Sequence, residues 1–277
     1  MPTNREAYFE ALELGVPKPV IDFALKEVNG FDYFELTKRF DENLVNYETF
    51  KNAIDRYLSG EMMEYVFKKT FFLSFPFYVD KSVLIPRQET EQLVLRSEEL
   101  IKEMFSNKRL NIADVCCGSG AIGLCLAKAF SNCVVFLSDI SKEAIRVSKT
   151  NAQNLKTDSN VSFFEGNMLD PFISNGIKLD VIICNPPYIE NEDTIDKRTW
   201  EQEPHLALIA KPNTKYYEDL LFKAKDVLNT KYLIAFEIGE DMEKPLSVLA
   251  NKYCPDCESL FEKDMYGKTR FLFIKHQ

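Results

Sequence analysis

This 277-residue chain lacks several features that mark particular protein classes. It has no run of eighteen apolar residues, so we expect no transmembrane helix. Its first residues, MPTNREAYFEALE, are charged and amphipathic, which is not typical of a secretory signal peptide. We therefore expect a cytoplasmic protein that has no membrane partner.

Positive charge is also scarce. The chain has 34 Lys and Arg against 43 Asp and Glu, which gives a net charge of -9. Proteins bind duplex nucleic acid non-specifically by neutralising its phosphates with Lys and Arg, so an acidic chain would need a local basic patch. We expect no stable binding to nucleic acid.

Residues that could form a metal site are few as well. The chain has only two histidines, His205 and His276, and Cys254-Pro-Asp-Cys257 is its only CxxC pair. Such a pair could be a redox motif or half of a zinc site, but the second half of a zinc site is missing. We interpret the pair as a chance occurrence and expect no metal. Most of the cysteines lie in apolar stretches, where we expect reduced, buried thiols.

The N-terminal part of the chain is predicted to be helical. Through residues 1–72, apolar side chains recur at helical spacing, which predicts a small helical-bundle domain. Aromatic and β-branched residues then gather around Pro76, which predicts a linking β-hairpin over 73–85. Residues 86–277 form the remaining, larger domain.

Strands and helices alternate through that larger domain. We expect strands at 110–115, 133–138, 161–165, 179–184, 231–237 and 270–275. We expect helices at 87–105, 121–130, 141–154, 216–227 and 240–251. This α/β alternation predicts a mostly parallel sheet that is covered by helices on both faces. Ligands of such sheets bind at the carboxyl ends of the strands.

A glycine-rich turn follows the first of these strands. Gly118-Ser119-Gly120-Ala-Ile-Gly123 has the spacing G-x-G-x-x-G and opens a helix, which favours a nucleotide-type ligand. Glycines let the backbone approach a ligand closely, and the N-terminus of the helix supplies free N–H groups. The alternative is a simple tight turn between a strand and a helix.

An acidic residue lies near the end of each of the first two strands. Asp139 can accept hydrogen bonds from both hydroxyls of a ribose, or it could cap the helix that starts near Ser141. Asp114, just before the glycine-rich turn, would repel a pyrophosphate but would suit a cationic ligand. It therefore favours S-adenosylmethionine (AdoMet) over a dinucleotide, whose pyrophosphate would lie on the helix N-terminus.

The fourth strand ends in the loop Asn185-Pro186-Pro187-Tyr188. Two prolines cannot continue a strand, and a residue before proline is pushed into an extended conformation, so this loop should be rigid. The side-chain oxygen of Asn185 and the carbonyl of Pro186 could accept the two hydrogens of an amide or an adenine amine, with Tyr188 packed on its planar face. The alternative is a proline-rich strand terminator.

These features together resemble the class I AdoMet-dependent amino-methyltransferases. More narrowly, the chain is similar to the HemK/PrmC family of protein-glutamine N-methyltransferases. The similarity is carried by VLIPRQETEQLV (83–94), NPPYIE (185–190), EPHLAL (203–208), FEIG (236–239) and GKTRFLF (267–273). It covers nearly the whole chain and implies a Rossmann-like, mostly parallel seven-stranded sheet, preceded by a helical bundle and a hairpin.

The resemblance implies methyl transfer from AdoMet to the glutamine of a Gly-Gly-Gln motif in class I peptide chain release factors, which leaves S-adenosyl-L-homocysteine. It implies catalysis by Asn185, Pro186 and Tyr188, and substrate contacts from these residues and Pro187. It implies a cofactor site of Asp114, Cys116, Cys117, Gly118, Ser119, Gly120, Asp139, Asn167, Met168 and Asn185. We expect a monomer in which residues 1–72 recognise the release factor.

The chain departs from the family pattern at a few positions. Cys116 stands at the first glycine of the loop and Cys117 follows it, and we expect both to be tolerated structural residues. Asn167 replaces the usual Asp, and its oxygen can still accept from the adenine amine. Three other interpretations are a nucleic-acid adenine methyltransferase with the same loop, a degenerate AdoMet-binding module and an NAD-dependent enzyme.

Overall fold

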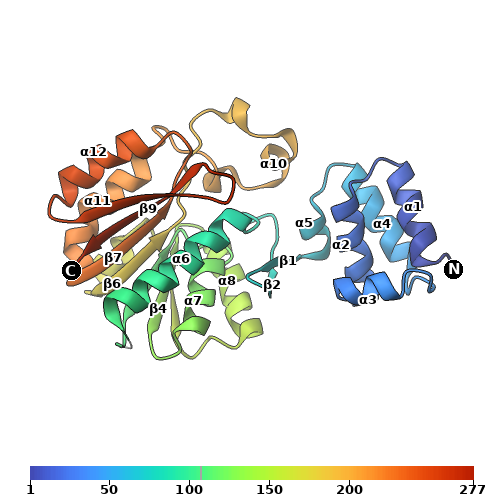
Figure 1. Ribbon diagram of the computed structural model, residues 1–277, viewed down its shortest axis with the longest axis horizontal. Helices are drawn as coiled ribbons and strands as arrows, with labels where there is room; N and C mark the ends of the chain where they lie inside the picture. Colours follow the sequence, from blue (N-terminus) through green and yellow to red (C-terminus); the bar gives the residue numbers. More distant parts are fainter. Residues whose placement is uncertain (107) are drawn as a thin grey trace. The chain divides into compact units, whose positions relative to one another are not determined.

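A computed structural model describes residues 1–106 and 108–277, and the chain divides into two compact units (Figure 1). The N-terminal unit consists of Met1–Lys69 and Lys197–Gln202. The sheet unit consists of Thr70–Asp196 and Glu203–Gln277. Among the helices of the described residues, none is long and apolar enough to cross a membrane.

The N-terminal unit is a bundle of helices, as the spacing of its apolar residues predicts. Its helices are α1 (Asn4–Glu13), α2 (Lys18–Asn29), α3 (Tyr33–Lys38), α4 (Tyr47–Leu58), α5 (Met63–Phe67) and α10 (Lys197–Gln202). Capping boxes begin two of them, because Thr3 and Asp32 each accept from the backbone three residues on and a Glu side chain bonds back. The buried faces of α1, α2 and α4 meet in one apolar core.

Helix α10 is an addition to this unit that its sequence does not reveal. The sequence pattern places residues 197–202 with the rest of 86–277, whereas the structure groups them with the N-terminal helices. Arg198 accounts for this, because its guanidinium lies 3.9 Å from the ring centroid of Tyr57 and donates to the Tyr57 carbonyl at 3.2 Å. Periodicity along the chain carries no information about such a contact.

The hairpin begins earlier than predicted. Its strands are β1 (Lys69–Phe72) and β2 (Phe75–Tyr78), so it starts at residue 69 rather than 73 and its second strand ends well before 85. The two-residue turn is made by Leu73 and Ser74, both with positive φ, at 47° and 67°. Such turns usually contain glycine or asparagine, and their lack here hides the turn from a reading of the sequence.

The sheet of the second unit has seven strands, as the family resemblance implies. They are β3 (Asn111–Val115), β4 (Val134–Asp139), β5 (Val161–Glu165), β6 (Leu179–Cys184), β7 (Leu228–Glu237), β8 (Glu258–Lys263) and β9 (Thr269–His276). Their order is β5-β4-β3-β6-β7-β9-β8, and only β9 runs antiparallel to its neighbours. The residue pattern misses β8, because this edge strand is largely exposed and has no buried face.

Helices cover both faces of this sheet (Figure 1). On one face lie α6 (Gln88–Phe105), α7 (Ala121–Ala129) and α8 (Lys142–Leu155), and on the other lie α9 (Asp170–Ser174), α11 (Lys215–Val227) and α12 (Glu243–Tyr253). Alternate residues of each strand enter the two cores: Val181 and Ile183 of β6 face one, whereas Ile182 and Cys184 face the other. Two short 3-10 helices, η1 (Glu192–Thr194) and η2 (His205–Ala207), follow β6.

The register of the central strands brings three loops together. Val115 of β3 pairs with Ser138 of β4 and with Cys184 of β6. The residues that follow these positions therefore emerge side by side at one edge of the sheet.

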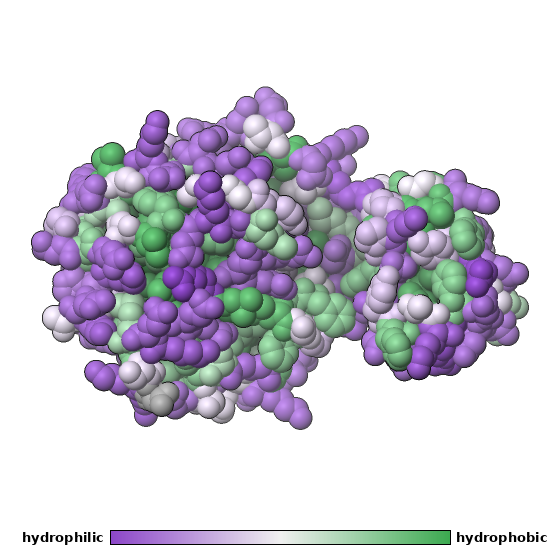
Figure 2. All heavy atoms as spheres, in the orientation of Figure 1, coloured by the Kyte–Doolittle hydropathy of each residue, from purple (hydrophilic) through white to green (hydrophobic). Residues whose placement is uncertain are grey.

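The surface and the cysteines agree with the composition. On the face drawn in Figure 2, hydrophilic side chains cover most of each unit and hydrophobic ones occupy smaller areas between them. All seven cysteines are free thiols, and five of them are buried. Cys254 is buried at the end of α12, and the sulfur of Cys257 lies 3.0 Å from the hydroxyl of Tyr232. The interpretation of Cys254 and Cys257 as a chance pair stays a prediction.

Candidate active site

A cavity opens over the carboxyl ends of β3, β4, β5 and β6 in the sheet unit. The four strands contribute their following loops to its wall, and the segment between the hairpin and α6, several helices and η2 contribute the rest. Its lining residues are Ser82, Val83, Leu84, Pro86, Arg87, Thr90, Cys116, Cys117, Gly118, Ser119, Ala121, Ile122, Asp139, Ile140, Ser141, Ala144, Gly166, Asn167, Met168, Asn185, Pro187, Pro204, Leu206, Ala207 and Tyr216. Most of the site residues expected from the sequence are therefore in one place.

The three glycines of the turn have different positions. Gly118, with φ 53°, lines the cavity, and a Cβ added to it would meet no atom within 4 Å. A Cβ on Gly120 would lie 3.0 Å from the side chains of Leu137 and Ser148, so this residue is packed against the protein. Of these two glycines, Gly118 is the one that leaves room for a ligand at the backbone, and the contact of Gly120 with the cofactor stays a prediction.

Asp114 lies beneath the turn and not on the cavity wall. Its side chain is fully buried, and its Oδ2 accepts from the backbone N–H of Gly123 at 2.8 Å. Burial raises the pKa of Asp114 to about 8. Asp114 thus holds the start of α7, and its predicted contact with the cofactor stays a prediction.

Asp139 does reach the cavity. It ends β4, and its two carboxylate oxygens accept from the backbone N–H groups of Gly118 and Ser141, each at 2.9 Å. Burial raises the pKa of this carboxyl. The cap of α8 is Ser141 itself, whose hydroxyl accepts from Ala144, so the interpretation of Asp139 as the helix cap is wrong. A carboxylate offers about four acceptor sites, so Asp139 keeps acceptor capacity for a ligand beside these backbone bonds.

The two cysteines of the turn take structural positions. Cys116 has φ 60°, a left-handed conformation that favours glycine, and its sulfur lies 3.6 Å from that of Met168. Cys117 is buried, and burial raises the pKa of its thiol well above the usual range. A buried, protonated thiol is a poor nucleophile. Asn167 and Met168 follow β5 and line the cavity beside these residues.

The loop after β6 contributes only part of its length to the wall. Asn185 and Pro187 line the cavity, whereas Pro186 and Tyr188 do not. The hydroxyl of Tyr188 instead lies 3.4 Å from Oε1 of Glu237. The packing of Tyr188 on the face of a substrate and the contact predicted for the Pro186 carbonyl both stay predictions.

Two functional candidates are absent from the sequence-based set. The Nδ2 of Asn185 donates to the hydroxyl of Thr90 at 3.2 Å, and that hydroxyl donates to Oε2 of Glu237 at 2.6 Å. Thr90 and Glu237 are both buried. A signal for Glu237 was available, because it is an acid at the end of an apolar strand like Asp139. Thr90 lies within α6, and no local pattern distinguishes it.

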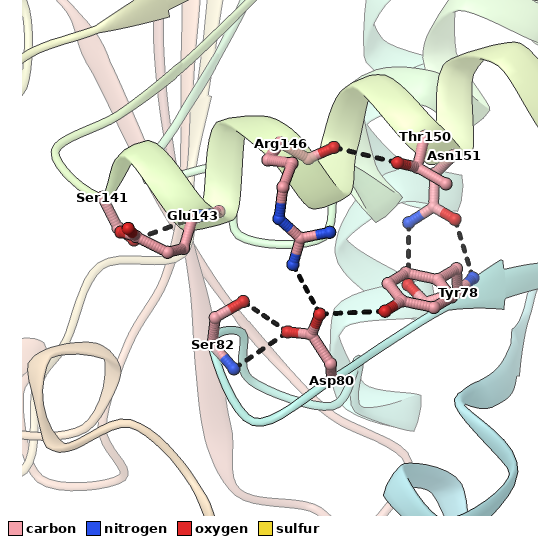
Figure 3. A network of polar contacts seen from close by, with 9 residues as sticks. Tyr78, Asp80, Ser82, Ser141, Glu143, Arg146, Thr150 and Asn151 are labelled. Atoms are coloured by element: carbon pink, nitrogen blue, oxygen red, sulfur yellow. Dashed lines mark hydrogen bonds and ion pairs between the residues drawn. The ribbon is translucent and has the colours of Figure 1, made fainter.

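Two further polar networks hold the wall in shape. Glu203 is buried and accepts from the guanidinium of Arg87 and from the backbone of Ile85 at 3.1 Å. Figure 3 shows the other network, in which Asp80 faces Arg146 of α8 at 2.6 Å and also accepts from Tyr78 at 3.0 Å. Each network includes a lining residue, Arg87 in the first and Ser82, which donates to Asp80, in the second, so both hold the wall in position.

Buried Asn151 connects the second network to the glycine-rich turn. It exchanges two hydrogen bonds with the backbone of Tyr78, at 2.7 and 2.9 Å, as Figure 3 also shows. Its Nδ2 also donates to the carbonyl of Ser119 at 2.9 Å. The hairpin and the turn are thereby tied to the same side chain of α8.

Sequence comparison finds close relatives. A family model described as the methyltransferase small domain matches residues 92–202. The release factor glutamine methyltransferase of Bacillus anthracis is 35% identical over 230 residues, which cover 82% of this chain and 81% of that protein. The enzyme of that name from Clostridium acetobutylicum is 35% identical over 262 residues, or 90% and 86%. The one from Mycoplasma mycoides is 32% identical over 258 residues, or 91% and 90%.

Solved structures of more distant proteins share the fold. The hMettl16 catalytic domain in complex with MAT2A 3'UTR hairpin 1 has a TM-score of 0.55 at 13% identity, covering 73% of this chain and 74% of that one. A human methyltransferase 10 domain containing protein has a TM-score of 0.52 at 12% identity, covering 73% and 88%. These similarities concern the fold alone, which is that of the class I methyltransferases.

Proposed function

Because the chain belongs to the family of release factor glutamine methyltransferases, we propose that it methylates the glutamine of the Gly-Gly-Gln motif in class I peptide chain release factors. The methyl group goes from AdoMet to the side-chain amide nitrogen. The observation that carries this proposal is the position of Asn185, whose side chain shares a cavity wall with Asp139. A group suited to holding a planar amide thus lies in the same cavity as an acid suited to a ribose.

The residues present fit AdoMet at the glycine-rich end of the cavity. When bound, AdoMet supplies a methyl group that is already activated by its sulfonium. Asp139 keeps acceptor sites for the ribose hydroxyls, and the open space at Gly118 admits a ligand against the backbone. Asn167 and Met168 would lie beside the adenine. The one Lys or Arg side chain on the cavity wall is Arg87, and it is paired with buried Glu203.

Asn185 would hold the substrate amide. Its Nδ2 is engaged by Thr90, so its Oδ1 is the atom left to accept an N–H of the glutamine. Accepting that hydrogen draws electron density onto the amide nitrogen and orients its lone pair. Because positioning two reactants removes much of the entropic cost of bringing them together, this alignment lowers the barrier to methylation. The amide nitrogen gains a methyl group and gives up one of its two hydrogens as a proton to solvent.

We propose further that the N-terminal helical domain, residues 1 to about 72, recognises the release factor, that the enzyme acts as a monomer, and that it binds no nucleic acid stably. Two adjacent aromatic side chains of α3, Tyr33 and Phe34, are about two-thirds exposed, at 65% and 64%, which suits contact with another protein. A fragment of residues 69–277 should keep AdoMet affinity and activity on a short Gly-Gly-Gln peptide but lose activity on the whole release factor. Full activity on the release factor would refute the recognition role.

The proposed reaction is tested with labelled AdoMet and purified acceptors. We expect label to enter a class I release factor, and peptide mapping by mass spectrometry should place it on the glutamine. A release factor in which that glutamine is replaced by alanine is the matched control. Labelling of DNA or RNA in place of the release factor would support the adenine methyltransferase interpretation and contradict ours.

A further inference from the structure

A buried acid lies behind the Asn185 amide. Glu237 ends β7 and is only 2% exposed, and Thr90 is only 4% exposed. The Oε2 of Glu237 accepts from the Thr90 hydroxyl at 2.6 Å, and the same hydroxyl accepts from Nδ2 of Asn185 at 3.2 Å. Thr90 and Asn185 line the cavity, whereas Glu237 does not.

The direction of these bonds follows from counting hydrogens. A threonine hydroxyl has one hydrogen, and an ionised carboxylate can only accept. The Thr90 hydrogen therefore points to Glu237, which leaves the Thr90 oxygen only as an acceptor for Asn185. Asn185 must then turn its nitrogen to Thr90 and keep its oxygen for another partner.

We propose that Thr90 and Glu237 are positioning residues that set the orientation of the Asn185 side-chain amide, so that its oxygen faces the substrate nitrogen. This inference rests on the proposed function for its consequence, although not for the orientation itself. Neither residue touches the reacting atoms, and both act through Asn185.

The surroundings of Glu237 compensate little of the free-energy cost of burying its carboxylate, which argues against a purely structural role. The positive charge of Arg270 on β9 acts on Glu237, but the guanidinium of Arg270 donates to Asp264 at 3.2 Å and to the carbonyl of Ile238 at 3.2 Å. A buried carboxylate without a direct ion pair is costly to the folded state. The position of the charge therefore calls for a function.

The chain of hydrogen bonds from Asn185 through Thr90 to Glu237 forms a relay, and protonation of Glu237 would reverse the direction of its bonds. A protonated Oε2 would donate to Thr90, whose hydrogen would then turn to Asn185 and bring the amide nitrogen into the cavity. The charged groups that face Glu237 are Arg270 and, from α6, Glu89; the Tyr188 hydroxyl also faces it, and the Tyr217 hydroxyl donates to its backbone carbonyl at 2.8 Å. Burial dominates among these effects and raises the pKa of Glu237. Methyl transfer should therefore slow as the pH falls through that pKa.

The experiment uses the whole enzyme and a Gly-Gly-Gln peptide at saturating AdoMet. Thr90→Val removes the hydroxyl and nearly keeps the shape, Thr90→Ser restores it, and Thr157→Val is the matched control. Thr157 is equally buried, at 4% exposed. It follows the end of α8, and its hydroxyl donates to the carbonyl of Ala152 within that helix. We expect Thr90→Val to lower the single-turnover rate roughly tenfold to hundredfold, with Thr90→Ser and Thr157→Val within about threefold of wild type.

Two measurements distinguish this relay from a purely structural role of Thr90 and Glu237: the pH profile of the rate and the exchange of the Asn185 amide protons. Glu237→Gln keeps an acceptor for Thr90 but cannot ionise, so its rate should lose the decline at low pH that the wild type has. In side-chain amide NMR, the Nδ2 protons of Asn185 should exchange slowly in the wild type and in Thr157→Val, and rapidly in Thr90→Val. Equal rates for Thr90→Val and Thr157→Val, or the same pH profile with and without Glu237, would overturn the proposal.

The NMR measurement separates this inference from the proposed function. Suppose that the wild type methylates no release factor or peptide, but that Asn185 exchange still depends on Thr90. The proposed substrate would then be wrong and the orienting role would stand. If methylation is observed while Asn185 exchange ignores Thr90, the function stands and the relay is wrong.

Discussion

The two ends of the cavity are built in different ways. At the glycine-rich end, Asp139 is held by the backbone N–H groups of Gly118 and Ser141. At the other end, Asn185 is held by side chains alone, through Thr90 to Glu237. Main-chain groups persist when side chains change, so the first end tolerates a cysteine at position 116. The second end depends on the side chains of Asn185, Thr90 and Glu237, and a change to any of them would alter it.

The largest effect is expected at the side-chain end. Asn185→Ala deletes the acceptor of the substrate N–H, whose hydrogen bond strengthens as charge leaves the amide nitrogen. We expect the single-turnover rate to fall about 10²–10³-fold, as when one preorganised hydrogen-bond partner is lost at a reacting centre. Isothermal titration should find little change in AdoMet affinity. A variant with near-normal turnover would show that Asn185 merely terminates a strand.

A smaller effect of a different kind is expected at the backbone-held end. Asp139→Ala removes the acceptor proposed for the two ribose hydroxyls and the partner of the Gly118 and Ser141 backbone N–H groups. We expect AdoMet affinity to fall by roughly 1–3 kcal/mol, measured by isothermal titration. Asp139→Asn keeps one acceptor oxygen, so its AdoMet affinity should lie between those of the wild type and Asp139→Ala. Unchanged affinity in Asp139→Ala would remove this residue from the cofactor site.

Beneath the same end, Asp114 should affect stability more than binding. Its pKa of about 8 lies above the ordinary 3.8, so between these values the folded state holds a proton that the unfolded state has released. The binding of this proton stabilises the folded state at low pH. The free energy of unfolding of the wild type should therefore fall as the pH rises from 4 to 8. Asp114→Asn cannot titrate and should gain stability relative to wild type over that range, measured by urea unfolding. A constant difference across the range would contradict the raised pKa.

The smallest effect is expected at Cys116. Its φ of 60° is strained for a residue with a Cβ, and glycine would relieve that strain. Cys116→Gly should raise the free energy of unfolding by up to about 1 kcal/mol, since the greater freedom of glycine in the unfolded chain offsets part of the gain. Cys116→Ala keeps the Cβ and serves as the control. Activity should stay within about threefold, and a collapse with normal AdoMet affinity would assign the thiol a role in the reaction.

The same contrast explains what the sequence could predict. Asp139 and Asn185 each follow an apolar run that ends in a turn, so local pattern places them at the carboxyl edge of the sheet. The family resemblance implies a mostly parallel sheet of seven strands, whereas the strand order and the antiparallel β9 come from the structure. Contacts between distant segments leave no such trace: Thr90 and Glu237 are separated by 147 positions, and α10 joins helices more than a hundred residues earlier. The same holds for Tyr188, whose hydroxyl lies 3.4 Å from Oε1 of Glu237, a contact that the loop sequence does not predict.

The central claim, that one end of the cavity binds the cofactor and the other performs the chemistry, is tested most directly by the double variant Asp139→Ala with Asn185→Ala. AdoMet affinity and the single-turnover rate at saturating AdoMet would be measured on the double variant and on both single variants. Independent sites predict that the double variant has the affinity of Asp139→Ala and the rate of Asn185→Ala. A rate loss in Asp139→Ala that matches Asn185→Ala even at saturating AdoMet would contradict the division.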